Sequence, residues 1–206
     1  ENCDGIGVSS VRDYSEEELD KISKIVKERS KLLGVHVGEV EDDLEKALTL
    51  DPDFMVHLTN VDGESLEKIR KRNMPVVLCP RANAMLGVGL PSLKELFEST
   101  LVALGTDNLM INSADMFREM DFTFKIIRGL YKDHLFDAKE VLKAATINGR
   151  RIFGLPANSI EEGNAADFVI VKREEYTTDP TLSLVHRTES SSVRGVFKNG
   201  ALINYD

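Results

Sequence analysis

Short apolar runs alternate with helical patterns along the first half of the chain. Between the runs, apolar residues recur at helical spacing, and the first such segment opens with Ser15 and Glu18, the pair of a capping box. Strands that start roughly 20–30 residues apart, with helices between them, form βαβ units and pair in parallel. A doubly wound sheet and part of a (β/α)8 barrel both satisfy this pattern. The expected strands cover residues 3–11, 32–37, 54–58, 75–79 and 101–105.

A different pattern begins after Asn108. Apolar residues at helical spacing predict a long amphipathic helix over residues 114–132. Asp137, with Glu140 three residues later, predicts the start of another helix that runs to about Gly149. The βαβ rhythm therefore gives way to consecutive helices.

The end of the chain is rich in β patterns. Asn199-Gly200 is a strong signal for a two-residue hairpin turn, because both residues tolerate a positive φ. We place a boundary near residue 156, which divides the chain into residues 1–156 and residues 157–206. The second part is too short for a β domain of its own and is expected to pair with other segments. Its expected elements are a strand over 166–172, a polar loop over 173–192, and strands over 193–198 and 201–204.

The composition of the chain argues against some classes of binding partner and predicts the cellular compartment. A net charge of −9 gives no electrostatic reason to bind nucleic acid or anionic lipid. Without tryptophan and with 6% aromatic residues, the chain is not expected to offer a base-stacking surface. No apolar run approaches the ~20 residues that a membrane helix needs. The two cysteines, Cys3 and Cys79, are too few for a disulfide framework, so a reducing, cytoplasmic location is expected.

Polar side chains that suit metal chemistry stand at the ends of three expected strands. These are His36 with Glu39, His57, and Asp107. Active sites of parallel α/β folds form at the carboxyl ends of strands, so the four side chains can converge. Two neutral imidazoles and a carboxylate suit zinc or ferrous iron. A further carboxylate could move protons for a metal-activated water.

Each of these residues also has an ordinary structural interpretation. A single histidine at a strand end is more often a hydrogen-bonded core or loop residue than a ligand. Glu39 could be a solvated loop carboxylate and Asp107 a turn cap. The placement of these residues at the ends of three strands favours a functional role over the structural one. The residues that share strand faces with His36 and Asp107 are small, so another group is expected to pack against them: Gly34, Gly38, Ala103 and Gly105.

Three further residues with reactive side chains are expected to be structural. His134 lies in the C-terminal region of a helix and His186 in the polar loop. Cys79 follows a strand, and a small buried thiol is the better interpretation, since Arg81 is the one nearby cation evident in the sequence.

Six segments together form a specific pattern. They are His36-Val37-Gly38-Glu39, Val56-His57-Leu58-Thr59, the run 79–89 that opens Cys79-Pro80-Arg81-Ala82-Asn83, Gly105-Thr106-Asp107-Asn108, the helix start at 115–120, and the run 162–169. The combination resembles the amidohydrolase superfamily, in the branch of the cytosine deaminases, S-adenosylhomocysteine deaminases and chlorohydrolases. The likeness spans nearly the whole chain in the right order, and the combination is specific although each piece alone is weak.

The resemblance implies a role for each matching residue. His36 and Asp107 would bind one divalent metal, with zinc first and iron second, and His57 is a further candidate ligand. Glu39 would shuttle a proton from water to the leaving nitrogen, and His57 would polarise the bond under attack. Asp107 would also take a proton from the metal-bound water. Arg81 and Asn108 are expected to touch the substrate.

Three departures from the family pattern are visible. No His-x-His pair occurs, although the family's first barrel strand supplies two metal ligands in that form. Leu78 stands before Cys79, where several relatives have histidine. The first strand carries Ser9 and Ser10 but no histidine, where the S-adenosylhomocysteine deaminases use one for the nucleoside. The first departure suggests the C-terminal portion of a longer enzyme, and the other two put an adenosine-type substrate in doubt.

The resemblance therefore implies the C-terminal part of a (β/α)8 barrel over residues 1–156 and the β arm of a small sandwich domain over residues 157–206. The expected function is hydrolytic deamination of an N-heterocyclic base or nucleoside. A chlorohydrolase activity and a non-catalytic half-barrel that binds a partner are the alternatives. The chain alone is expected to be inactive without the N-terminal half of the barrel, and the protein is expected to form a homo-oligomer.

Overall fold

The structure, a computed structural model, describes residues 3–156, 159–172 and 177–203. It divides into two compact units, Glu1–Ala114 and Asp115–Asp206. The predicted boundary near residue 156 stays a prediction. None of the helices in these ranges combines the length and hydropathy that crossing a bilayer requires.

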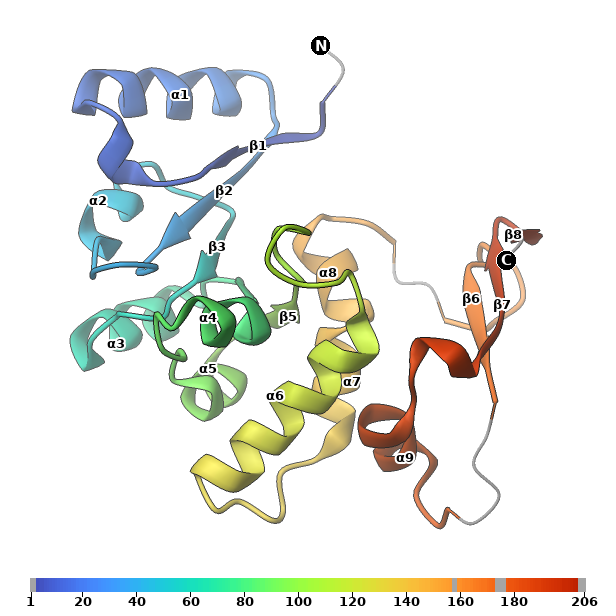
Figure 1. Cartoon of the computed structure of the whole chain (residues 1–206). Helices are drawn as coiled ribbons and strands as arrows, with labels where there is room; N and C mark the ends of the chain where they lie inside the picture. The colour runs from blue at the N-terminus through green and yellow to red at the C-terminus, as the bar shows by residue number, and fades with distance from the viewer. Residues whose placement is uncertain (1–2, 157–158, 173–176, 204–206) are drawn as a thin grey trace. The chain divides into compact units, whose positions relative to one another are not determined.

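A five-stranded parallel sheet forms the centre of the first unit (Figure 1). The strands lie in chain order, so each one pairs with the strand that follows it in sequence, and β1 and β5 form the two edges. All five predicted strands are present, each within its expected run. They are β1 (Gly5–Val8), β2 (Leu32–Val37), β3 (Phe54–His57), β4 (Val76–Leu78) and β5 (Val102–Leu104).

Helices connect the strands, as the pattern predicted. The capping box at the start of α1 is confirmed: Ser15 accepts from the Glu18 backbone N–H, and the Glu18 carboxylate accepts from the Ser15 N–H. Asp62 caps α3 by accepting from the Ser65 N–H. The connecting helices are η1 (Val11–Asp13), α1 (Glu16–Glu28), α2 (Leu44–Leu48), α3 (Gly63–Arg72), α4 (Pro80–Leu86) and α5 (Leu93–Ser99).

Helix α4 has no counterpart among the sequence predictions. It begins directly after Cys79, whose side chain makes no capping hydrogen bond, and it is only seven residues long. Pro80 favours this start, because proline at the first helical position has φ already set and lacks an N–H that would be unpaired there. The helix buries Ala82 and Asn83, and it ends at Gly87 in the left-handed conformation.

The core of the first unit consists of strand residues and the apolar faces of the helices. Val35, Val37 and Met55 have no exposed surface, and neither do Leu93 and Leu96 of α5. Strands buried in this way read as continuous apolar runs, as expected for a parallel sheet covered on both faces.

The second unit combines helices with a small antiparallel sheet in the order β6-β7-β8. The predicted hairpin is confirmed: Asn199 and Gly200 have φ of 50° and 79°, as a turn between twisted strands requires. The elements are α6 (Met116–Leu130), α7 (Ala138–Ala144), α8 (Ile147–Ile152), β6 (Phe168–Val171), α9 (Pro180–Arg187), η2 (Ser190–Ser192), β7 (Val193–Lys198) and β8 (Ala201–Ile203).

Two sequence predictions about this unit are wrong. The helix expected from Asp137 to about Gly149 is two helices, because Thr146 leaves helical geometry with φ −132° and ψ −90°. The polar loop expected over 173–192 contains α9 and η2, and His186 lies in the last turn of α9; residues 173–176 lie outside the described residues. Asp179 followed by Pro180 is a helix start, since Asp179 accepts from the Leu182 N–H and proline occupies the first turn.

Candidate metal centre

The rings of His36 and His57 meet edge to face, with centroids 4.9 Å apart. The regular alternation of side chains between the two faces of a strand would not produce this contact. In the β2–β3 pairing, His36 lies opposite Val56, whereas His57 lies opposite Val37. Residues opposite each other share a face of the sheet, so an ideal strand would place the two imidazoles on opposite faces. His57 instead has φ of 74°, in the left-handed region, which redirects its side chain toward His36.

Several residues at the carboxyl ends of the strands have left-handed backbone. Leu58 follows His57 with φ of 55°, Asp107 has φ of 59° after β5, and Gly38 has φ of 66° after β2. A non-glycine residue in this region costs on the order of 1–3 kcal/mol and persists only where the surroundings enforce it. His57, Leu58 and Asp107 have this backbone at the carboxyl edge of the sheet, and Ser30, Asp51 and Asn73 have it where the chain leads into β2, β3 and β4.

Hydrogen bonds join the loop after β2 to the loop after β3 and fix the backbone of Glu39. The Asn60 backbone N–H donates to the Gly38 carbonyl at 2.7 Å, and the Asn60 side-chain Nδ2 donates to the Glu39 carbonyl at 2.9 Å. The Gly38 N–H donates to Asp43 Oδ1 at 2.8 Å. Glu39 is thereby held beside the end of β2, close to both histidines.

His36, Glu39 and His57 form the one group of three potential metal-binding side chains in the described part of the chain. One ligand atom from each lies within 4.8 Å of the others. Burial lowers the pKa of His36, and the neighbouring His57 lowers it further, while Glu39 and Asp107 act in the opposite direction. His36 is therefore neutral at physiological pH and has a lone pair to offer. Imidazole nitrogens and a carboxylate oxygen are ligands that zinc binds at ~2.0–2.2 Å, so the residues present fit a divalent metal.

Asp107 lies at the same carboxyl edge, just past β5, but it is not part of that group of three. Its Oδ1 accepts from the Asn108 backbone N–H at 2.7 Å, and its charge acts on His36. Its assignment as a metal ligand and proton acceptor stays a prediction, as do the roles assigned to His36, Glu39 and His57.

Asn83 is a buried residue of this site to which the sequence analysis assigned no role. It comes from α4, is 1% exposed, and lies within hydrogen-bond distance of His57, with Oδ1 3.0 Å from Nδ1. Its Nδ2 donates to Thr59 Oγ1 at 2.8 Å. The signal that could have found it is an amide among the apolar positions of the segment after β4, since a buried amide needs polar partners.

The small residues near the site are explained by their neighbours in the sheet. A Cβ added to Gly34 would lie 2.4 Å from the Phe54 ring, and one added to Gly105 would lie 3.2 Å from both Cys79 Sγ and Val77. The expectation that another group packs against these glycines is therefore met by side chains of the same unit.

The remaining candidates differ in their contacts and their exposure. Arg81 Nη1 approaches the Ser113 carbonyl at 3.4 Å, and Asn108 is exposed with its Oδ1 accepting from the Met110 N–H. His134 is exposed, and Cys79 is buried as expected; neither Cys79 nor Cys3 forms a disulfide.

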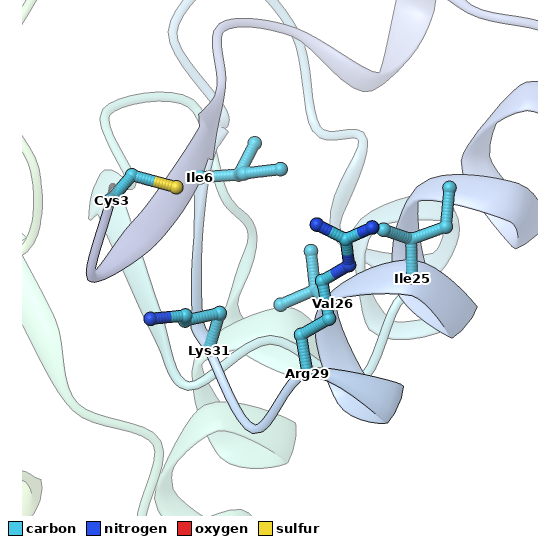
Figure 2. Close-up of a pocket in the computed structure, with 6 residues that line it drawn as sticks. All are labelled: Cys3, Ile6, Ile25, Val26, Arg29 and Lys31. Atoms are coloured by element: carbon cyan, nitrogen blue, oxygen red, sulfur yellow. The ribbon is translucent and has the colours of Figure 1, made fainter. Parts of the chain in front are cut away.

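The hollow drawn in Figure 2 does not belong to this site. It has a volume of about 360 Å³ and lies between β1 and the C-terminal end of α1, lined by apolar side chains and two cations. Cys3 and Lys31 come just before β1 and β2, so the hollow lies at the amino ends of the strands. Parallel α/β folds place catalytic groups at the opposite edge.

Comparison with known proteins agrees with this arrangement. Residues 4–203 match the Amidohydrolase family. An uncharacterised protein of Methanocaldococcus jannaschii is 35% identical over 92% of this chain and 54% of its own length. A 5-methylthioadenosine/S-adenosylhomocysteine deaminase of Pyrococcus furiosus is 29% identical over 91% of this chain and 46% of its own length.

Among solved structures, an adenosine deaminase of Xanthomonas campestris with bound zinc superposes with a TM-score of 0.86. It is 22% identical and covers 96% of this chain and 51% of its own length, so the likeness shows the fold. The predicted fold class is confirmed: the C-terminal part of a (β/α)8 barrel with the β arm of a small domain. The chain spans about half the length of the curated relatives it matches. With a match over nearly every residue, this chain belongs to the amidohydrolase family.

Proposed function

We propose that the whole protein is a metal-dependent hydrolase that releases ammonia from a small N-heterocyclic base or nucleoside. The observation that carries the proposal is the convergence of His36, Glu39 and His57 at the carboxyl edge of a parallel sheet. The name of the Pyrococcus furiosus relative, a deaminase of two adenosine derivatives, supports the substrate class.

His36 and Asp107 are proposed to hold one divalent metal, zinc in preference to iron, with His57 as a further ligand. A neutral imidazole and a carboxylate are donors of the kind that catalytic zinc uses. A metal bound there lowers the pKa of water and so supplies a nucleophile at neutral pH.

The other groups of the chain handle protons and position the reacting bond. Glu39, half-buried beside the two imidazoles, is proposed to carry a proton to the leaving nitrogen. The ring of His57, set by its left-handed backbone, is proposed to polarise the bond under attack. Arg81 and Asn108 are proposed to contact the substrate.

The described residues make only part of such a site. Catalytic zinc usually has three protein ligands and a water, and the family's His-x-His pair does not occur in this sequence. We propose that the remaining ligands lie outside this chain, and that the chain alone is inactive.

The test uses the protein in its full natural length. We expect about one zinc or iron per polypeptide by elemental analysis. We also expect ammonia release from at least one of methylthioadenosine, adenosine, guanine and cytosine. Removing the metal with a chelator should abolish this release, and added zinc should restore it.

Two outcomes would contradict the proposal. Chloride release from a chlorinated triazine, without ammonia release from the panel, would indicate a chlorohydrolase. A well-folded protein that binds no metal and converts none of these compounds would indicate the alternative of a non-catalytic binding module.

A further inference from the structure

The hydrogen bond between Asn83 and His57 determines which nitrogen of the His57 ring carries the proton. Nδ1 faces the amide oxygen of Asn83 at 3.0 Å, and both residues are 1% exposed. An amide oxygen only accepts hydrogen bonds, so Nδ1 must be the protonated nitrogen in this arrangement. Nε2 of the neutral ring then carries the lone pair.

Thr59 gives the amide of Asn83 a second partner. Asn83 Nδ2 donates to Thr59 Oγ1 at 2.8 Å, so the amino group is engaged on the side away from His57. If the amide were reversed, Nδ2 would donate to Nδ1, and Nε2 would carry the ring proton instead. That reversed arrangement would remove the lone pair from Nε2, the ring nitrogen that does not face Asn83.

We propose that Asn83 is a positioning residue that holds His57 in the Nδ1–H tautomer and so presents the Nε2 lone pair to the space shared with His36 and Glu39. The inference rests on the proposed function and bears on the two roles proposed there for His57: a metal requires that lone pair, whereas polarising the bond under attack would require an Nε2–H. Asn83 acts through His57 and does not touch the reacting atoms. Histidines at metal sites are oriented in this general way, by a partner on the second ring nitrogen.

The geometry around Asn83 explains why an amide is needed at this position. Its helix, α4, begins two residues after the end of β4, whereas His57 is the last residue of β3 and Thr59 lies two residues beyond it. The side chain therefore fixes two points of the adjacent strand end, which has left-handed backbone at His57 and Leu58. An apolar residue would fill the space but would leave the buried His57 Nδ1–H without a hydrogen-bond partner, which is unfavourable.

The tautomer can be read directly by NMR. The full-length protein would be labelled with ¹⁵N-histidine, freed of metal with a chelator, and studied near pH 8.5, well above the ordinary histidine pKa of about 6.5. Long-range ¹H–¹⁵N spectra distinguish a protonated from an unprotonated ring nitrogen. The His57 signals are assigned by their loss in His57→Gln.

We expect the Nδ1–H form in the natural protein and in Asn83→Asp, whose carboxylate also accepts. Asn83→Leu, which keeps most of the volume, should shift His57 toward the Nε2–H form and lower turnover by roughly 10–100-fold, as for other residues that orient metal-site histidines.

Several results would overturn the inference. The first is an Nε2–H form of His57 in the natural protein, which needs no variant to fold. The others are an unchanged tautomer in a folded Asn83→Leu, and unchanged turnover despite a changed tautomer. Metal binding with the Nε2–H form would refute the inference alone, whereas the Nδ1–H form in a protein that binds no metal and turns nothing over would refute the proposed function alone.

Discussion

The sheet beside the metal centre has no room for a methyl group at Gly34, so Gly34→Ala should destabilise the protein measurably. The added Cβ would lie 2.4 and 2.6 Å from two carbons of the Phe54 ring, on the strand paired with it. Carbon atoms pack at about 3.5–4.0 Å, so the ring must move by roughly 1 Å. Gly34 is buried, and the overpacking of a closed core costs about 1–3 kcal/mol.

The assay is equilibrium unfolding in urea, followed by circular dichroism on the full-length protein. Phe54→Leu removes the ring, so the double variant Gly34→Ala/Phe54→Leu should be more stable than the sum of the two single effects, with a coupling of about 0.5–3 kcal/mol. Gly63→Ala is the matched control, because an added Cβ there meets nothing within 4 Å. Its free energy of unfolding should stay the same or rise slightly.

Two results would refute this reasoning. If Gly34→Ala unfolds at the same urea concentration as the natural protein, the ring is not the barrier to a methyl group. If the double variant shows only the sum of the single effects, then the destabilisation does not come from the contact between Gly34 and Phe54.

Three further predictions concern the proton shuttle, the pH dependence of folding and the behaviour of the isolated chain. Glu39→Gln should keep its metal and lose roughly 10²–10⁴-fold in turnover, whereas His36→Ala should lose metal and activity together. The control His134→Gln, at an exposed position, should keep both, and unchanged turnover in Glu39→Gln would exclude the proton-shuttle role. The hydrogen bond from Lys27 lowers the pKa of Asp51 in the folded protein, so this ion pair stabilises the fold above the unfolded pKa of about 3.9, and the stabilisation is lost as pH falls through the lower folded pKa. Lys27→Met should abolish that part of the pH dependence of the unfolding free energy, and an unchanged pH dependence in the variant would contradict the assignment. Residues 1–206 alone should self-associate through the edge strands β1 and β5 in analytical ultracentrifugation, and a monodisperse monomer with one sharp unfolding transition would argue against a half-barrel.

The architecture of the first unit is predictable from sequence because its strands are continuous apolar runs with clear ends. The strand predicted over 32–37 coincides with β2. Its residues are apolar or glycine apart from His36, and Gly38 follows its last residue. The start of α1 is predictable for a similar reason, because the Ser15–Glu18 capping box is a local signal. Local chemistry determined both elements, and no tertiary contact was needed to find them.

The elements that the sequence analysis missed depend on weaker or competing signals. Helix α9 lies in a polar stretch, and its Asp179-Pro180 start was outweighed by composition. Helix α4 is a short helix with no side-chain cap, so only Pro80 marks its beginning. In both cases burial of a few side chains, such as Val185 in α9 and Asn83 in α4, stabilises a helix that local propensity alone leaves ambiguous.

The position of both histidines at strand ends predicted that His36 and His57 approach each other, but not which backbone conformation brings them together. Strand alternation alone would separate the rings, and the left-handed backbone at His57 and Leu58 that brings them together has no marker in the sequence, because neither residue is glycine. The contact with Asn83 comes from a helix that was not predicted, so its role could not be assigned.

The pairing of neighbouring strands in chain order bears on how the protein is made. His36, Glu39 and His57 all lie within one βαβ unit, and the strands that carry them pair directly. Contacts between segments close in sequence require little loop closure and form early in folding. A ribosome releases the chain from its N-terminus, and domains fold in that direction during synthesis. The pairing of β2 with β3 can therefore form on a nascent polypeptide once β3 has emerged, whereas the ring of His57 is held in place only after β4 and α4 have brought Asn83 to it.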